Sequence, residues 1–307
     1  MGWFLASSLL SGCVEYVVQA PDVEAVPPVV VEERFVQAAL PEVDVLFVVD
    51  STGSMADEQV ALAGAAATFL DTLAGLNLAY QIGVTTTDPA DDGVLVGRPW
   101  IVTASTENPA AALASALQVG AESAPPAAGF YTATRTLTDE QGFNRGFRRA
   151  DAGLHVIFVS DGDDQSDLWL GIDPGSAFLT TLADQETSSG RVARVSAVVG
   201  DVPGGCGTEP AARYTALAEA TGGIVQSLCT ADFSAVAAAL GGAAAEYATR
   251  FPLEWAPVEG SARVEIDGVR VESGWRLDLV DPALVFDTAP AADAEISILY
   301  TLVVEEE

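Results

Sequence analysis

The sequence predicts an α/β protein with a doubly wound, mostly parallel sheet flanked by helices, followed by a small all-β module. A continuous apolar run at residues 45–49 and a mainly apolar segment at residues 154–160 are typical of parallel strands buried on both faces. Segments with apolar residues at helical spacing alternate with such runs up to residue 249. From residue 250 the pattern changes to short stretches in which apolar and polar residues alternate.

The elements of the α/β region follow one another in a regular order. Strands are expected at 45–49, 79–85, 100–103, 154–160, 192–199 and 224–226. Helices are expected at 57–76, 108–119, 129–137, 178–184, 210–220 and 232–247. In doubly wound folds, ligands bind beyond the carboxyl ends of the strands. The loops after Val49 and Ser160 are therefore where functional side chains are expected.

The remaining segments complete the predicted domain organisation. The α/β domain covers residues 43–249 and the β module covers residues 250–307, where alternating valine and isoleucine flank an Asp267-Gly268 hairpin pair. Residues 13–42, rich in Pro, Val and Glu, are interpreted as a tether. That interpretation leaves room for one strand near residues 29–31, which would pair with the β module.

The charge balance excludes several classes of function. The 307 residues include 44 acidic and 13 basic side chains, giving a net charge of -31, and every basic residue is arginine. Nucleic acid is excluded as a partner because phosphate binding needs a basic surface. The absence of lysine excludes Schiff-base chemistry and a P-loop, and the single histidine, His155, is expected to be a packed strand residue.

The first twelve residues are interpreted as a lipoprotein signal peptide. The apolar run at residues 2–12 is too short for a bilayer span, which takes roughly 20 residues, and it suits a secretory signal. It ends in Leu10-Ser11-Gly12-Cys13, which resembles the bacterial lipobox. That resemblance implies a mature protein that begins at a lipidated Cys13, and Val14 favours the outer membrane of the cell envelope. The alternative is a buried strand with a chance cysteine.

Two cysteines remain in the predicted α/β domain. Cys206 and Cys229 form an even pair in a chain that carries an export signal, which predicts one disulfide. The alternative is two separate buried thiols.

Oxygen-bearing side chains follow two of the predicted strands. The first strand is followed by Asp50-Ser51-Thr52-Gly53-Ser54, and the strand at 154–160 is followed by Asp161. In neighbouring parallel strands, the two carboxylates would lie at one edge of the sheet, and a divalent cation would relieve their repulsion. A set of carboxylate and hydroxyl oxygens is typical of a Mg²⁺ site.

These paired motifs resemble the von Willebrand factor A domain, and the resemblance covers about residues 41–249. It implies a metal-ion-dependent adhesion site with Mg²⁺, or alternatively Mn²⁺ or Ca²⁺, as the cofactor. Thr52 and Ser54 would bind the metal directly, whereas Asp50 and Asp161 would bind it directly or through water. The family draws a further hydroxyl from a loop that here spans residues 120–128 and offers only Ser123.

Other interpretations of these residues remain open. A hydroxyl from Thr85, Thr86 or Thr87 would replace that of Ser123. Ser54 with Asp57 also fits a capping box at the start of a helix. The acidic residues at 163, 164 and 167 are interpreted as a solvated loop or as a Ca²⁺ site.

Three functions are compatible with the sequence. The first is a non-enzymatic, membrane-anchored lipoprotein with an adhesion or assembly role, whose metal binds an acidic side chain of a protein partner. The second is a structural lipoprotein of the envelope with a degenerate, metal-free site. The third is a metal-dependent hydrolase, for which the sequence shows acidic loops but no further catalytic group.

Overall fold

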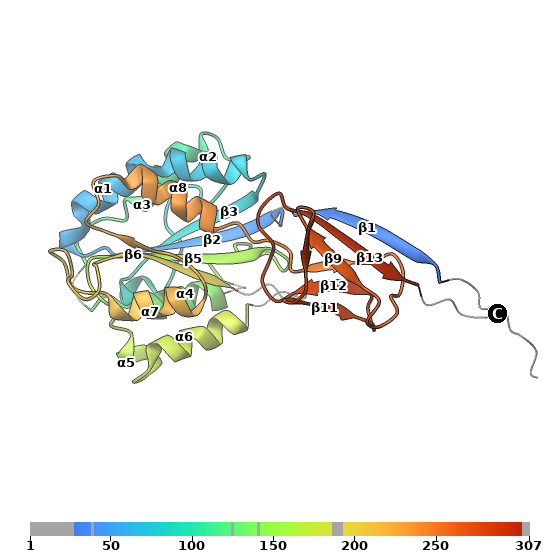
Figure 1. Cartoon of the computed structure of the whole chain (residues 1–307). Coiled ribbons are helices and arrows are strands. Elements are labelled where there is room, and N and C mark those ends of the chain that lie inside the picture. The colour runs from blue at the N-terminus through green and yellow to red at the C-terminus, as the bar shows by residue number, and fades with distance from the viewer. Residues whose placement is uncertain (1–27, 38–39, 124–125, 140–141, 186–192, 303–307) are drawn as a thin grey trace, which may run out of the picture.

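A computed structural model describes residues 28–37, 40–123, 126–139, 142–185 and 193–302. Cys13 and the predicted signal peptide before it lie outside these residues. The predicted fold class is confirmed, since a mostly parallel sheet flanked by helices is followed by antiparallel sheets (Figure 1). No helix in the described ranges is long and apolar enough to cross a membrane.

Six strands form the central sheet in the order β4-β3-β2-β5-β6-β7. All neighbours are parallel except β3 and β4. The chain therefore winds outward in both directions from the β2–β5 pair, where the strand order reverses. The bounds are β2 (Glu42–Val49), β3 (Ala79–Thr86), β4 (Ile101–Thr103), β5 (Gly153–Ser160), β6 (Arg194–Val199) and β7 (Val225–Ser227).

Helices cover both faces of this sheet (Figure 1). One layer holds α1 (Ala56–Gly64), α2 (Ala66–Gly75), α3 (Pro109–Leu117) and α8 (Phe233–Ala243). The other holds α4 (Gly129–Thr138), α5 (Asp167–Leu170), α6 (Pro174–Ala183) and α7 (Ala212–Ala220). The predicted helix at 57–76 is two helices, because the chain leaves helical geometry at Ala65.

Strand β2 shows why the apolar runs predicted buried strands. Val45, Phe47 and Val49 pack into the core on one face of the sheet. Leu46 and Val48 pack into the core on the other face. A strand between two helical layers has no solvent-facing side, so every residue of its centre is apolar.

The β module is built from both ends of the described chain. Its sheets are β1-β13-β9-β10 and β11-β12-β8. Strand β1 (Val30–Val36) pairs antiparallel with β13 (Glu295–Thr301). The α/β domain is thus inserted between β1 and β8 (Figure 1). The other bounds are β8 (Arg250–Pro252), β9 (Arg263–Ile266), β10 (Val269–Val271), β11 (Trp275–Asp278) and β12 (Ala283–Phe286).

The segments that join the two domains are hydrogen-bonded to each other. The Gln37 amide nitrogen donates to the carbonyl oxygen of Ala248 at 2.8 Å. The backbone N–H of Leu40 donates to the carbonyl oxygen of Glu246 at 2.8 Å. The chain therefore enters and leaves the α/β domain through two backbone segments that lie side by side.

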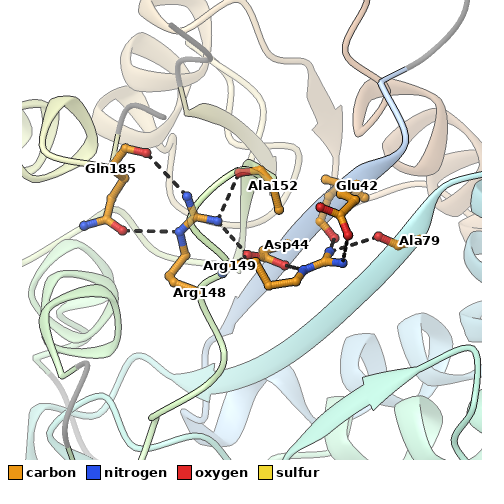
Figure 2. Close-up of polar contacts among 8 residues, drawn as sticks. Glu42, Asp44, Ala79, Arg148, Arg149, Ala152 and Gln185 are labelled. Carbon is orange, nitrogen blue, oxygen red and sulfur yellow. Dashed lines mark hydrogen bonds and ion pairs between the residues drawn. The ribbon is translucent and has the colours of Figure 1, made fainter. Parts of the chain in front are cut away.

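A buried ion cluster closes the amino edge of the central sheet (Figure 2). Asp44 on β2 is fully buried, and its carboxylate accepts hydrogen bonds from Arg148 Nη1 at 2.6 Å and from Arg149 Nε at 2.7 Å. Arg149 also donates to the carbonyl oxygens of Val43 and Ala79. Burial raises the pKa of Asp44, and the hydrogen bonds and charge of Arg149 oppose that rise.

Candidate functional site

The two motifs meet at the carboxyl edge of the sheet. Val49 on β2 lies opposite Val159 on β5, so Asp50 and Asp161 follow directly on neighbouring strands. The backbone N–H of Asp50 donates to the carbonyl oxygen of Val159 at 2.8 Å, which extends the pairing by one residue. This is the point at which the strand order reverses, and doubly wound folds bind ligands there.

The Asp50 carboxylate is buried, with 1% of the residue exposed. One carboxylate oxygen accepts from the backbone N–H of Thr52 at 2.8 Å and from the Thr87 hydroxyl at 3.4 Å. The other accepts from the Ser160 hydroxyl at 2.5 Å. All three donors are neutral, and the described residues contain no ion pair that joins Asp50 to an arginine. The carboxylate oxygens are therefore hydrogen-bonded, but no arginine of the described residues neutralises their negative charge.

Two hydroxyls lie in the turn that follows Asp50. The Thr52 and Ser54 hydroxyl oxygens are 3.3 Å apart, and Ser54 is exposed to solvent. Adjacent oxygens around Mg²⁺ are about 3.0 Å apart when each lies about 2.1 Å from the metal in octahedral geometry. The observed spacing is within a few tenths of an ångström of that value, so these two hydroxyls are spaced as neighbouring Mg²⁺ ligands would be.

The loop that carries Ser123 reaches the site, but its hydroxyl has another partner. Ser123 forms a parallel bridge with Thr52, and its backbone N–H donates to the carbonyl oxygen of Ser51 at 3.1 Å. Its hydroxyl oxygen lies 2.7 Å from that of Ser51. Of the alternative threonines, Thr87 contacts Asp50, whereas the hydroxyls of Thr85 and Thr86 donate to Val94 and Asp91.

Asp161 is half-buried and is held through its backbone. Its carbonyl oxygen accepts from the N–H of Glu209 at 3.1 Å, in the loop after β6. That loop is fastened by the Cys206–Cys229 disulfide, so the predicted bridge is confirmed. Cys229 in turn precedes α8, whose first turn is capped by Asp232. The disulfide therefore joins two of the loops at the carboxyl edge of the sheet.

The alternative in which Ser54 caps α1 is wrong. Ser54 lies in a short 3-10 turn, and the residue that precedes α1 is Met55, which makes no side-chain capping bond. The Ser54 hydroxyl therefore makes no capping hydrogen bond to α1.

The acidic loop after Asp161 is not solvated throughout. The prediction of a solvated loop is wrong for Asp164, which is buried. Asp164 is 2% exposed and accepts from the backbone N–H groups of Phe130 and Ser166, each at 2.9 Å. Burial raises the pKa of Asp164 to about 6. Arg213 binds both oxygens of Asp167, at 2.6 and 3.0 Å.

No group of three or more His, Cys, Asp or Glu side chains suited to a metal ion occurs among the described residues. A metal at the carboxyl edge would therefore depend on the hydroxyls of Thr52 and Ser54 besides its two carboxylates. His155 is buried, with one ring nitrogen 2.8 Å from the Ser196 hydroxyl, and burial lowers its pKa to about 3. It lies within the core rather than at this edge.

Sequence reasoning missed two features of this region. Gln59 is 3% exposed and hydrogen-bonds the backbone of Asp50 and of Gly120. In the sequence, Gln59 is one polar residue among several in a predicted helix, and no motif or spacing indicates that it is buried. The burial of Asp164 likewise depends on α4, which lies 26 residues or more earlier in the chain.

Comparisons with known proteins give structural similarity only. No protein-family model matches the chain, and no curated protein matches it. Among solved structures, a von Willebrand factor type A protein from Catenulispora acidiphila is 16% identical, with a TM-score of 0.42 over 90% of this chain and 66% of that one. The pilus adhesin SpaC from Lactobacillus rhamnosus GG is 14% identical, with a TM-score of 0.39 over 91% of this chain and 42% of that one.

A third similar structure is proximal thread matrix protein 1 from the mussel byssus. It is 13% identical, with a TM-score of 0.40 over 71% of this chain and 49% of that one. The chain thus spans between 42% and 66% of the lengths of these three structures. Strand order, the antiparallel edge strand and the paired Asp50 and Asp161 motifs at the reversal point together give the α/β domain a von Willebrand factor A-like fold.

Proposed function

We propose that this protein is a lipid-anchored binding protein of the bacterial cell envelope, with an adhesion or assembly role and no catalytic activity. Its α/β domain would hold a divalent cation through Asp50, Thr52, Ser54 and Asp161, with Mg²⁺ preferred over Mn²⁺ or Ca²⁺. The anchor would be the acylated Cys13, which places the protein at the outer membrane. Ser123 is a candidate for a further ligand, provided that its hydroxyl leaves Ser51.

The observation that carries the proposal is the Asp50 carboxylate. It is buried, and the hydrogen bonds that it accepts from the described residues come from neutral donors. A buried charge is costly unless it is paired, and a bound cation would supply the missing positive charge. The adjacent hydroxyls of Thr52 and Ser54 add the hard oxygen ligands that Mg²⁺ prefers.

The proposed partner is a protein that offers an acidic side chain. When bound, Mg²⁺ would present an open coordination position to a carboxylate oxygen. The net charge of -31 opposes an acidic partner at long range. At physiological salt this repulsion is screened beyond about 8 Å, so the local cation dominates at contact. Association is therefore expected to be faster at moderate salt than at low salt.

One observation favours a second candidate, a metal-independent assembly protein. The Ser123 hydroxyl is paired with Ser51, and Asp50 already accepts three hydrogen bonds. A site satisfied in this way is stable without a cation.

Calorimetric titration of the metal-free protein with Mg²⁺, Mn²⁺ and Ca²⁺ separates the two candidates. We expect one saturable site in the parent and an affinity reduced by more than about 100-fold in Asp50→Asn, since loss of an outer-shell partner alone costs 10–100-fold. Asp57→Asn is the matched control, because it removes an exposed charge nearby that is not a proposed ligand. A parent that binds no metal at millimolar concentration would leave the metal-independent candidate.

A further inference from the structure

Gln59 is a buried polar residue that no proposed metal ligand accounts for. It lies on α1, is 3% exposed, and extends toward two loops of the carboxyl edge rather than into solvent. One loop begins with Asp50, and the other follows α3 and leads through Gly120 to Ser123.

The nitrogen and the oxygen of the Gln59 side-chain amide are both hydrogen-bonded. Its nitrogen donates to the carbonyl oxygen of Asp50 at 2.8 Å and to that of Gly120 at 2.7 Å. Its oxygen accepts from the backbone N–H of Gly120 at 3.2 Å. Two donors and one acceptor within a single planar group are available only from an amide, because a carboxylate cannot donate and an ammonium cannot accept.

The contacts made by Gln59 align the two loops for further pairing. Gly120 has a φ of +97°, a conformation that glycine adopts at little cost and that redirects the loop after α3. Three residues later, the backbone N–H of Ser123 donates to Ser51, and Ser123 pairs with Thr52. Gln59 is buried at one end of this set of contacts, and the half-buried Ser123 lies at the other end, where its hydroxyl pairs with that of Ser51.

We propose that Gln59 is a positioning residue of the carboxyl-edge site: its amide ties the loop of Asp50 to the loop of Gly120 and so fixes the oxygen ligands in the spacing that a divalent cation requires. The inference rests on the proposed metal-binding function. A ligand set held in place by a second layer of hydrogen bonds binds metal more tightly than one that must reorganise. Gln59 would therefore affect metal affinity without touching the metal.

The test compares two buried amides with the same structural task. Asn144 is 4% exposed and ties Gly93 and Leu95 together through its side-chain amide, in the segment after β3 rather than in the loops of Asp50 and Gly120. Gln59→Met and Asn144→Leu each replace an amide by an apolar side chain of similar size. Both are made in the full-length protein, and Mg²⁺ affinity is measured by calorimetry beside thermal unfolding without metal.

We expect both variants to lower the Tm, whereas only Gln59→Met weakens Mg²⁺ binding, by about 10- to 100-fold. Hydrogen exchange gives an independent readout, in which the Gly120 and Ser123 amides lose protection in Gln59→Met and keep it in Asn144→Leu. If Gln59→Met does not fold, Gln59→Asn retains the amide with one methylene less of reach and is expected to weaken binding by about tenfold.

The outcomes separate this inference from the proposed function. Unchanged affinity in a folded Gln59 variant of a metal-binding parent overturns the positioning role and leaves the metal site intact. Equal weakening in Asn144→Leu also overturns it, because general destabilisation then explains the loss. A parent that binds no metal overturns both the metal site and the inference.

Discussion

Two buried aspartates occupy opposite ends of strand β2, and they are stabilised in different ways. Asp44, at the amino edge, is bound by the guanidinium groups of Arg148 and Arg149 (Figure 2). Asp50, at the carboxyl edge, is bound by one backbone N–H and two hydroxyls. The two residues have the same chemistry and nearly the same burial, at 0% and 1% exposed.

The difference distinguishes a structural carboxylate from one that is available to a ligand. The arginines at Asp44 neutralise its charge within the protein and connect β2 to the segment before β5. The donors at Asp50 hold its geometry but leave its negative charge uncompensated. In a chain with 44 acidic and 13 basic residues, arginines neutralise the aspartate at one end of the strand, whereas no arginine of the described residues pairs with the aspartate at the other end. The proposed cation site rests on this difference.

The largest expected effect is at the amino edge. Asp44→Asn should lower the free energy of unfolding by about 3–5 kcal/mol at pH 7, because it removes the buried carboxylate that pairs with both Arg148 and Arg149 and leaves Arg149 only the more exposed Glu42 among the described ion pairs. Urea denaturation measures this change. The exposed Asp71→Asn is the control and should stay within about 0.5 kcal/mol of the parent. If Asp44→Asn loses no more unfolding free energy than Asp71→Asn, the arginines at Asp44 do not stabilise the fold, and the contrast drawn between Asp44 and Asp50 fails.

The next effect concerns Asp164, whose pKa burial raises to about 6 from 3.8. The folded protein then holds the extra proton between about pH 4 and pH 6, so this group lowers stability as the pH rises through that window. Relative to the parent, Asp164→Asn should gain about 2–3 kcal/mol of unfolding free energy between pH 4 and pH 7, because it stays neutral. Urea denaturation across this range gives the difference, and a pH-independent difference would contradict the raised pKa.

The smallest effect is expected at the carboxyl edge in the absence of metal. Asp50→Asn should change the free energy of unfolding by less than about 1 kcal/mol, since the amide oxygen can still accept from Thr52 and the lost charge has no counter-ion. With Mg²⁺ at about 100 times its Kd, the parent should gain about 2.7 kcal/mol and the variant nothing. Metal-free destabilisation as large as that of Asp44→Asn would show that Asp50 is structural too.

Local pattern was sufficient for the central sheet. The runs around Phe47 and Ile157 predicted buried parallel strands, and β2 and β5 are neighbours whose ends, Val49 and Val159, lie opposite each other. Strand β1 was harder to predict at its full length. Its exposed and half-buried residues alternate, it includes Glu33 and Arg34, and its partner β13 lies about 260 residues later in the chain.

The role of single polar residues could not be predicted from the sequence. Asp164 and Asp167 are similar acidic residues in one loop, yet the first is buried against the start of α4 and the second is exposed beside Arg213. Gln59 and Gln118 both lie in segments predicted to be helical, yet Gln59 is buried against the loops of Asp50 and Gly120 and Gln118 is exposed. Burial and partners of this kind arise when distant segments meet, and no periodicity encodes them.

The sequence by itself determined the fold class, the two motifs and the disulfide pair, because each of these depends on local apolar pattern or on the number of cysteines. Tertiary structure alone decided which carboxylates are neutralised and which are not. That choice depends on whether an arginine from a distant segment reaches a buried aspartate, as Arg149 reaches Asp44 across 105 positions of the chain and as no arginine of the described residues reaches Asp50.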